Sequence, residues 1–405
     1  MGPTRLALAY ARRRPLATLL VIALAAFGTA IVVLTLAVSR ELEERLTRDS
    51  AGIDLVVGAK GSPLQLVLAG VFHVDVPPGN IPLAAVDELR AHPMIAQAIP
   101  LALGDSFRGF RIVGTEPALI AHYGGRLALG ATWTKPMEAV LGSQVARATG
   151  LRPGAQFTGS HGLSESGGEH GDAPYTVVGI AAPTGTVLDR MVLTSVESVW
   201  AVHDAHHPPQ AQEDDHDHAG RAGPAREVTM VLVRYVGPLA AASLPRELNE
   251  STNYVAASPA YETARLLTVF GIGLDLVRAF ALLLVAASAL MLFVALAQAL
   301  DERRYDLAIL RALGAHRLQV AWVLVAESVT LALAGAALGW VLAQGAMVVA
   351  GTWLPAAAPL ARAAWTLRAV DAWIAAGAAA AGILAALWPA WQAYRLDVAA
   401  TLADA

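Results

Sequence analysis

A cluster of histidines is the first feature of this 405-residue chain that could carry out chemistry. The stretch HDAHHPPQAQEDDHDH holds five of the eleven histidines and five carboxylates, without lysine or arginine. Neutral imidazole and carboxylate groups suit zinc, nickel or copper(II), but short histidine-rich tracts also bind metals loosely through composition alone. We therefore expect a loop over residues 203–226 that is either a weak zinc site or a solvated acidic insertion without a role. The candidate ligands are His203, His206, His207, His216 and His218.

The chain lacks the motifs of common nucleotide-hydrolysing and hydrolytic enzymes. A P-loop requires Gly-Lys followed by Ser or Thr, because the lysine ammonium contacts the nucleotide phosphates. The only two lysines, Lys60 and Lys135, instead follow Ala59 and Thr134. The patterns G-x-S-x-G and H-E-x-x-H are absent as well. We expect no enzyme active site and no cofactor on this chain, so a role driven by ATP needs a second subunit.

Composition places the chain among membrane proteins. Apolar residues make up 56% of it and charged residues only 15%. The lack of cysteine excludes thiolate metal sites and disulfides, and a net charge of -4 offers no basic surface for nucleic acid. About 20 consecutive apolar residues can span a bilayer, and four runs reach this length. The predicted transmembrane helices are residues 16–38, 276–300, 320–350 and 371–394.

Arginines near the helix ends predict the orientation. They lie before the first helix, between the second and third, and after the fourth, and such residues favour the cytoplasmic side. The first run is longer than a signal-peptide core and no small-residue cleavage site follows it, so we expect it to be retained. Residues 39–275 and 351–370 then lie outside the membrane. The predicted cytoplasmic parts are an amphipathic segment 1–15, the segment 301–319 and the tail 395–405.

Residues 39–275 are predicted to form a large outer domain between the first and second transmembrane helices. Short β-branched runs alternate there with short helical runs, which indicates an α+β fold. Helix-forming flanks at both ends indicate two stalk helices that continue the adjoining transmembrane helices. The predicted strands are 52–59, 107–115, 175–182 and 227–237, and the predicted helices are 81–92, with Pro82 in its first turn, and 142–150.

The most specific segment is DERRYDLAILRALGAH, residues 301–316. On a helix, the leucines at 307, 310 and 313 fall along one face, while Arg304 and Arg311 share a neighbouring face. Acidic residues near its N-terminal end fit the helix dipole. A solvated charged loop would need neither an apolar stripe nor a Leu-Gly-Ala stop. We therefore expect an amphipathic cytoplasmic helix that docks on a partner protein.

This segment resembles the signature of FtsX/MacB-type ABC transporter permeases, the type VII group, which reads roughly E-R-R-x-E-I-A-[IV]-L-R-A-[IL]-G-A. Asp306 replaces the usual Glu, Leu307 the usual Ile and His316 a common Thr or Ser, and these changes are conservative. The resemblance covers most of the chain. It includes the one-plus-three helix order, EAVLGSQVARATGLRPGAQF with YTVVGI in the outer domain, and the ending WPAWQAYRLDVAATLAD, where Val398 stands in place of a frequent Pro. The matching signature positions are Glu302, Arg303, Arg304, Ala308, Ile309, Leu310, Arg311, Ala312, Leu313, Gly314 and Ala315.

The resemblance implies the permease subunit of an ABC transporter. In this family the cytoplasmic helix is a coupling helix seated in a groove of a separate ATPase, which binds ATP and magnesium. Two permeases, as a homodimer or a pseudo-symmetric heterodimer, join two ATPases. Closure of the ATPases moves the outer domains, so substrate need not cross the membrane through the permease. The implied coupling residues are Glu302, Arg303, Arg304, Asp306, Leu307, Leu310, Arg311, Leu313 and Gly314.

The third transmembrane helix carries residues that indicate close packing. Gly335 and Gly339 form a G-x-x-x-G pattern, which lets helix backbones approach closely, and we expect them at a permease dimer interface. Glu327 is the only acid of this helix, and a membrane carboxylate is a functional candidate by default. It lies about two turns from the cytoplasmic end. Snorkelling to the membrane surface, or pairing with Arg304 or Arg317, is therefore favoured over proton transfer.

We accordingly predict a multi-pass ABC permease of the bacterial inner membrane, in contact with membrane lipid and with a periplasmic partner as a further expectation. Its cargo stays open between lipoprotein extraction, peptide or drug export and control of cell-wall hydrolases, and the histidine-rich loop favours a link to zinc. The alternative is a membrane-anchored, metal-responsive sensor or scaffold without transport. A sensor or scaffold has no need of an ATPase-docking helix.

Overall fold

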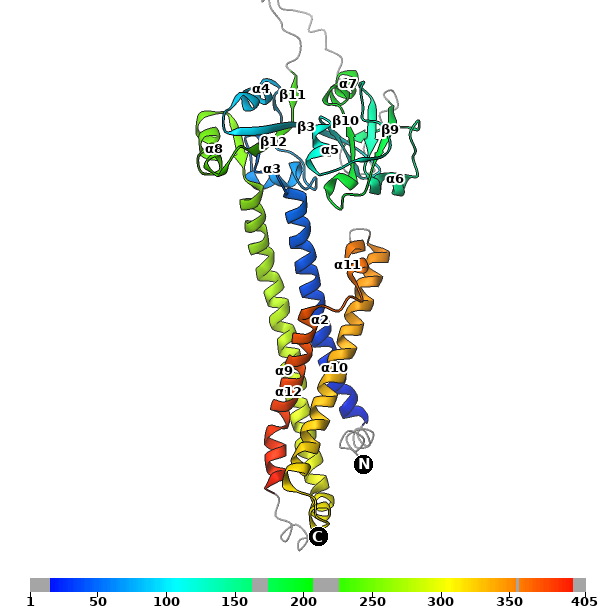
Figure 1. Ribbon diagram of the computed structural model, residues 1–405, viewed down its shortest axis with the longest axis vertical. Coiled ribbons are helices and arrows are strands. Elements are labelled where there is room, and N and C mark those ends of the chain that lie inside the picture. The colour runs from blue at the N-terminus through cyan, green and yellow to red at the C-terminus, as the bar shows by residue number, and fades with distance from the viewer. Residues whose placement is uncertain (1–14, 162–173, 207–225, 355–356, 396–405) are drawn as a thin grey trace, which may run out of the picture. The chain divides into compact units, whose positions relative to one another are not determined.

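The computed structural model describes residues 15–161, 174–206, 226–354 and 357–395 (Figure 1). The chain divides into two compact units. The first, which we call the membrane unit, comprises Met1–Leu42 and Val269–Ala405, and the second, the outer unit, comprises Glu43–Thr268. Two long helices, α2 and α9, contribute residues to both units.

Four long apolar helices dominate the membrane unit, as the four apolar runs predict. The one-plus-three order of these helices around an α+β domain is confirmed. Buried leucines, valines and alanines from all four helices form a shared core, which includes Val21, Leu296, Leu324 and Ala386. The helices are α2 (Pro15–Ser50), α9 (Pro259–Ala312), α10 (Arg317–Trp353) and α12 (Ala369–Tyr394), with a short helix α11 (Ala358–Ala363) between the last two.

Exposed tryptophans lie near both ends of α10 and α12. Tryptophan is enriched where a membrane meets water, because the ring is apolar and its N–H can reach a polar partner. At one end Trp340 and Trp365 also pack edge to face, with ring centroids 5.8 Å apart. The exposed members are Trp322, Trp388 and Trp391 at one end, and Trp353, Trp365 and Trp373 at the other.

The outer unit is built on a mixed sheet with the strand order β13-β1-β12-β3-β4-β10-β6-β9-β5. Strands β7 and β8 pair with β9 and β3, and β2 and β11 form a separate pair. The strands are β1 (Leu55–Ala59), β2 (Ile81–Pro82), β3 (Ile95–Phe107), β4 (Phe110–Gly114), β5 (Leu127–Gly130), β6 (Glu138–Leu141), β7 (Gln156–Phe157), β8 (Ser160–His161), β9 (Tyr175–Ala181), β10 (Met191–Thr194), β11 (Glu227–Val228), β12 (Met230–Tyr235) and β13 (Tyr254–Ala257).

Helices cover this sheet on both faces. The alternation of side chains along a strand sends Leu55 and Val57 of β1 into one core and Val56 into another, so β1 is buried on both faces. Helices α4 and α8 pack in the first of these cores and α3 in the second. The helices are α3 (Pro63–Gly70), α4 (Ala84–Ala91), α5 (Ala118–His122), α6 (Ser143–Thr149), α7 (Val196–His206) and α8 (Pro238–Ser251), with a 3-10 turn η1 (Val187–Arg190).

Strand β3 belongs to two halves of the outer unit. Its N-terminal part, up to Leu101, pairs with β12, and its C-terminal part, from Ala102, pairs with β4. We call the side of β12, β1, β13, α3, α4 and α8 the first half, and the side of β4, β10, β6, β9, α5, α6 and α7 the second half. Figure 1 shows β3 between α4 and α8 on one side and β10 and β9 on the other.

Several local predictions differ from the structure. Residues 107–115 are not one strand, because Arg108 and Gly109 have φ angles of 47° and 78° and form the turn between β3 and β4. Pro82 ends β2 instead of opening a helix, and α4 begins at Ala84. Strand β10 and helix α7 are further elements without a predicted counterpart.

Candidate functional site

The predicted coupling segment is not a separate helix but the last three turns of α9 with the turn into α10. Helix α9 ends at Ala312, and Gly314 follows with a φ of 101°, which favours glycine. The backbone N–H of Ala315 donates to the carbonyl of Leu310, and that of Gly314 to the carbonyl of Arg311. This pair of bonds is the Schellman motif, which satisfies carbonyls at a helix end. The Leu-Gly-Ala sequence therefore sets a sharp reversal of the chain.

His316 begins α10 from the other side of this turn. Its backbone N–H donates to Oε1 of Gln319 at 3.0 Å, and its Nδ1 accepts from the backbone N–H of Leu318 at 3.4 Å. A Thr or Ser side chain would accept the same kind of hydrogen bond at a helix start. Histidine therefore serves here as the N-cap, in place of the common hydroxyl residue.

The leucines of the coupling segment divide into a buried and an exposed group. Leu307 is 7% exposed and packs in the core of the membrane unit, next to the fully buried Ala308. Leu310 and Leu313 are 40% and 81% exposed. Of the predicted apolar stripe, Leu307 therefore packs inside the membrane unit, whereas Leu310 and Leu313 remain open to a partner.

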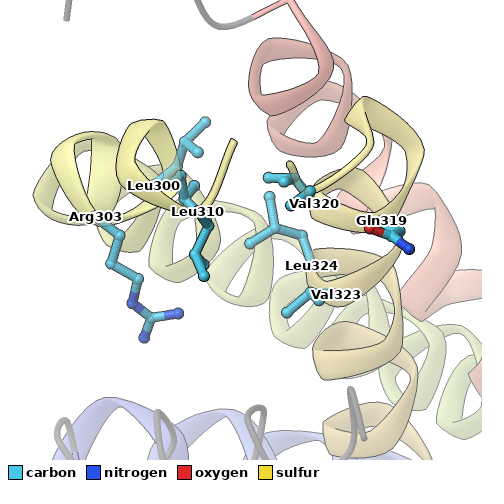
Figure 2. Close-up of a pocket in the computed structure, with 9 residues that line it drawn as sticks. Leu300, Arg303, Leu310, Gln319, Val320, Val323 and Leu324 are labelled. Carbon is cyan, nitrogen blue, oxygen red and sulfur yellow. The ribbon is translucent and has the colours of Figure 1, made fainter. Parts of the chain in front are cut away.

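A small apolar pocket of about 90 Å³ lies between this end of α9 and the start of α10. Figure 2 shows Leu300 and Leu310 of α9 facing Val320 and Leu324 of α10. The remaining lining residues are Arg303, Leu307, Ala315, Gln319 and Val323.

Glu327 forms an ion pair, but its partner is Arg303 and not the expected Arg304 or Arg317. The distance from Arg303 Nη1 to Glu327 Oε2 is 3.3 Å. Arg304 instead pairs with Asp301 on its own helix at 2.9 Å. Arg303 shares a face with the buried Leu307 one turn later, whereas Arg304 lies on the outward face. The leucine spacing on either side of Arg303 was a usable signal that the sequence analysis missed.

The glycine pair of α10 packs against α2 of the same chain. A Cβ at Gly335 would lie 2.6 Å from Ala25 Cβ, and one at Gly339 would lie 2.4 Å from the carbonyl oxygen of Ala26. Both contacts are shorter than a real Cβ atom tolerates. Both glycines thus bring α10 close to α2 within the membrane unit, and a permease dimer interface at these positions stays a prediction.

The remaining predicted coupling residues lie on the surface or outside the description. Glu302 and Arg304 are exposed, and Arg311 is half-buried. Gly314 is exposed in the turn, and the side chain of Asp306 lies outside the described part of α9. The structure thus brings Arg303, Leu307 and Leu310 together around one pocket and leaves Leu313 beside it in the open.

The histidine-rich stretch falls largely outside the described residues. His203 and His206 are in the last turns of α7, with side chains outside the description, and His207, His216 and His218 lie outside it entirely. Among the described residues, no group of three or more His, Asp or Glu side chains is arranged to hold a metal ion.

A contact that the sequence analysis missed holds the end of α2 in the outer unit. Asp49 is only 6% exposed, and its Oδ2 lies 3.4 Å from Nη2 of Arg190. The hydroxyl of Tyr123 donates to the backbone carbonyl of the same residue at 3.1 Å. Burial raises the pKa of Tyr123, so its hydroxyl stays a donor. The last turn of α2 is thereby tied to η1 and to the residue after α5.

The fold and these contacts define a multi-pass membrane protein with an α+β domain between its first and second spans. The model of the MacB-like periplasmic core domain matches residues 18–260, and that of the FtsX-like permease C-terminal domain matches residues 278–398. The chain therefore belongs to the FtsX/MacB-type ABC transporter permeases, and the resemblance seen in the sequence is confirmed. It is a permease subunit and a multi-pass protein of the inner membrane, in a family that works with an ABC ATPase and typically has no ATPase site of its own.

Two solved structures resemble the chain in part. The periplasmic region of MacB from Actinobacillus actinomycetemcomitans is 11% identical, with a TM-score of 0.35, and the match covers 56% of this chain and 97% of that one. The extracellular domain of YknZ, a noncanonical ABC-type transporter from Gram-positive bacteria, is 11% identical, with a TM-score of 0.31, over 50% of this chain and 99% of that one. No curated protein matches the chain.

Proposed function

We propose that this chain works by mechanotransmission, transferring the closure of a separate, dimeric ATPase to its outer unit. The coupling segment at the end of α9 seats in the ATPase, and the outer unit acts on a substrate or partner outside the membrane. Two copies of the permease, or one copy and a related chain, complete the complex. Both termini and the coupling segment face the cytoplasm.

The observation that carries this proposal is the continuity of α9. It begins at Pro259, separated from β13 of the outer unit by Ser258 alone, and continues as one helix to Ala312 in the coupling segment. A helix transmits displacement along its axis because every turn is hydrogen-bonded to the next. A push on the coupling segment is thus delivered to a strand of the outer unit without an intervening loop.

The exposed side chains at the coupling end support a docking role. Leu310 and Leu313 are followed directly by the reversal at Gly314, so they lie at the tip of the helix pair. Tyr305 and Ile309 on the same turns are also exposed, at 49% and 37%. Exposed apolar side chains at a cytoplasmic tip gain free energy when a partner covers them. A groove on the ATPase is the partner that the family supplies.

The test is co-purification of the tagged chain with an ABC ATPase from its own cells. Changing both Leu310 and Leu313 to Glu should remove the ATPase from the purified complex. Docking of the ATPase would then have to remove water from two carboxylates, which costs free energy. The matched control is Leu367→Glu, because Leu367 is 82% exposed but lies between α11 and α12. A stoichiometric ATPase on the double variant would contradict the coupling assignment. A wild-type chain that purifies without any ATPase would favour the sensor or scaffold alternative.

A further inference from the structure

The outer unit contains a cleft of about 530 Å³ between its two halves. One wall is α4 of the first half, and the other is formed by the loop 133–136 and the start of α7 in the second half. Pro100, at the middle of β3, lies between the walls. Ligand sites commonly have volumes of about 300–1,000 Å³ and lie between structural lobes. The cleft therefore has the size and place of a binding site for a small or medium ligand.

Hydrogen bonds join the elements that line the cleft. Arg90 of α4 donates from Nη2 to Oε1 of Glu116, after β4, at 2.6 Å, and its guanidinium also donates to the carbonyl of Ala98. The indole Nε1 of Trp200 on α7 donates to the carbonyl of Glu227 on β11 at 2.6 Å. A ligand would thus meet walls that are already in position, which lowers the entropic cost of binding.

The lining offers flat apolar surfaces. Trp133 is 7% exposed and belongs to the core of the unit, so the part of it that reaches the cleft is held rigidly. Trp200 is half-buried, and the guanidinium of Arg226 lies 5.0 Å from the centre of its ring. Pro117 and Pro136 add rigid apolar surface on the second half. Such surfaces contact aliphatic and proline side chains at little entropic cost.

The charged side chains of the cleft are balanced in sign. Arg90 and Glu116 neutralise each other as an ion pair. The remaining charges are two carboxylates, Asp87 and Glu197, and two cations, Lys135 and Arg226. A site for nucleotides or other polyanions would need a net positive lining, and here Glu197 occupies the first turn of α7, where an anion would otherwise bind. A site for lipid chains would lack these four charges.

We propose that this cleft binds a short peptide with free termini. Asp87 and Glu197 are the carboxylates available to its amino group, Lys135 and Arg226 are the cations available to its carboxylate, and Trp133 and Trp200 are the surfaces available to an apolar side chain. A short peptide is a common ligand that carries both signs of charge on an apolar body. The proposal is independent of the coupling to ATP, because binding would occur to the permease alone.

The natural lack of cysteine makes a direct binding test practical. Thr134→Cys places one thiol at the rim of the cleft, where an environment-sensitive dye reports a bound ligand. The full chain in nanodiscs is titrated with a mixture of pentapeptides with free termini. We expect a saturable change in dye emission. The matched probe is Ser251→Cys, at the exposed end of α8 outside the cleft lining, which should stay silent.

Charge variants then test how the peptide is held. Asp87→Asn combined with Glu197→Gln should weaken binding at least about tenfold, whereas Glu88→Gln, the next residue on α4 but outside the lining, should not. Peptides with an amidated C-terminus should bind the wild type more weakly than peptides with a free carboxylate. A variant with Lys135→Gln and Arg226→Gln should bind both kinds of peptide equally. An absent signal, equal signals from both dye positions, or affinities unchanged in the charge variants would overturn the proposal. Saturable binding of ATP or glycerophosphate in place of peptide would overturn it as well.

Discussion

Arg303 and Glu327 form an ion pair that joins the coupling end of α9 to the N-terminal part of α10. Both side chains are largely buried, at 13% and 7% exposure. Burying a charge costs free energy unless an opposite charge and hydrogen bonds compensate it. The pair therefore holds the coupling segment against α10. It also explains why an acid persists within an otherwise apolar helix.

Loss of one member of this pair should be more harmful than loss of both. We expect Glu327→Gln to lower the free energy of unfolding by about 3 kcal/mol, because it removes the carboxylate beside the buried Arg303 guanidinium. Combining Arg303→Met with Glu327→Leu should recover most of this loss. Arg304→Met, which breaks only the exposed pair with Asp301, should change stability by less than about 1 kcal/mol. Thermal unfolding in detergent measures all three, and equal losses in the single and double variants would contradict the prediction.

Two alanine substitutions on α10 should have opposite effects. Gly339→Ala would force its Cβ into the backbone of α2 at Ala26 and should cost about 1–3 kcal/mol. At Gly345 no atom lies within 4 Å of the Cβ position, so Gly345→Ala should stabilise the helix by up to about 1 kcal/mol. Thermal unfolding gives the sign of each change. If Gly339→Ala left stability intact but dissociated a permease dimer, the glycines would act between chains after all.

The stability of the outer unit should depend on pH through His73. Burial and the nearby guanidinium groups of Arg111 and Arg190 lower the pKa of His73 to about 3 in the folded chain. Between about pH 6.5 and pH 3 the unfolded chain therefore binds a proton that the folded chain does not, so the free energy of unfolding falls as the pH falls. From about pH 7.5 to pH 5 this amounts to at most about 2 kcal/mol.

His73→Asn is the variant that isolates this effect. His73 has a φ of 55°, a backbone conformation that asparagine tolerates better than most residues, and asparagine does not titrate. Unfolding midpoints recorded at several pH values should therefore fall less steeply in the variant than in the wild type. Parallel curves would show that His73 does not contribute.

The zinc prediction for the histidine-rich stretch is tested best on the full chain. Replacing His203, His206, His207, His216 and His218 with Ala should abolish weak zinc binding measured by calorimetry, because imidazole supplies the ligands. A control with His92→Ala and His316→Ala, both outside the stretch, should keep the wild-type heat. Identical, negligible heats in all three proteins would remove the metal hypothesis.

The membrane helices were predictable because the length and apolar composition of each segment are sufficient to identify it. Apart from Glu327 itself, the run that contains it is uncharged over a membrane thickness, and so is the run before Tyr394. The coupling segment was predictable because Gly314 and the leucine spacing are local signals. Partners were harder to predict. Nothing in the sequence around Gly339 distinguishes α2 of the same chain from a helix of a second copy, because both would be apolar helices.

In the outer unit, the errors arose where a turn or a long-range contact decides the structure. Arg108 takes a positive φ beside Gly109, and Arg-Gly is not among the common turn pairs. Strand β10 is a run of only four residues, Met191–Thr194, and it is stable because β4 and β6 flank it. Its pairing partners lie about 50 to 80 residues earlier in the chain, beyond the reach of a local pattern.

The sharing of β3 between the two halves of the outer unit limits how these halves can move. No flexible linker separates them at this point, so a change in their relative angle must twist a single strand. The ladder between β3 and β4 is irregular between Leu103 and Ser106, and such irregularities concentrate the twist and bend of a strand. We therefore expect any change in the angle between the halves to concentrate in β3 after Leu103.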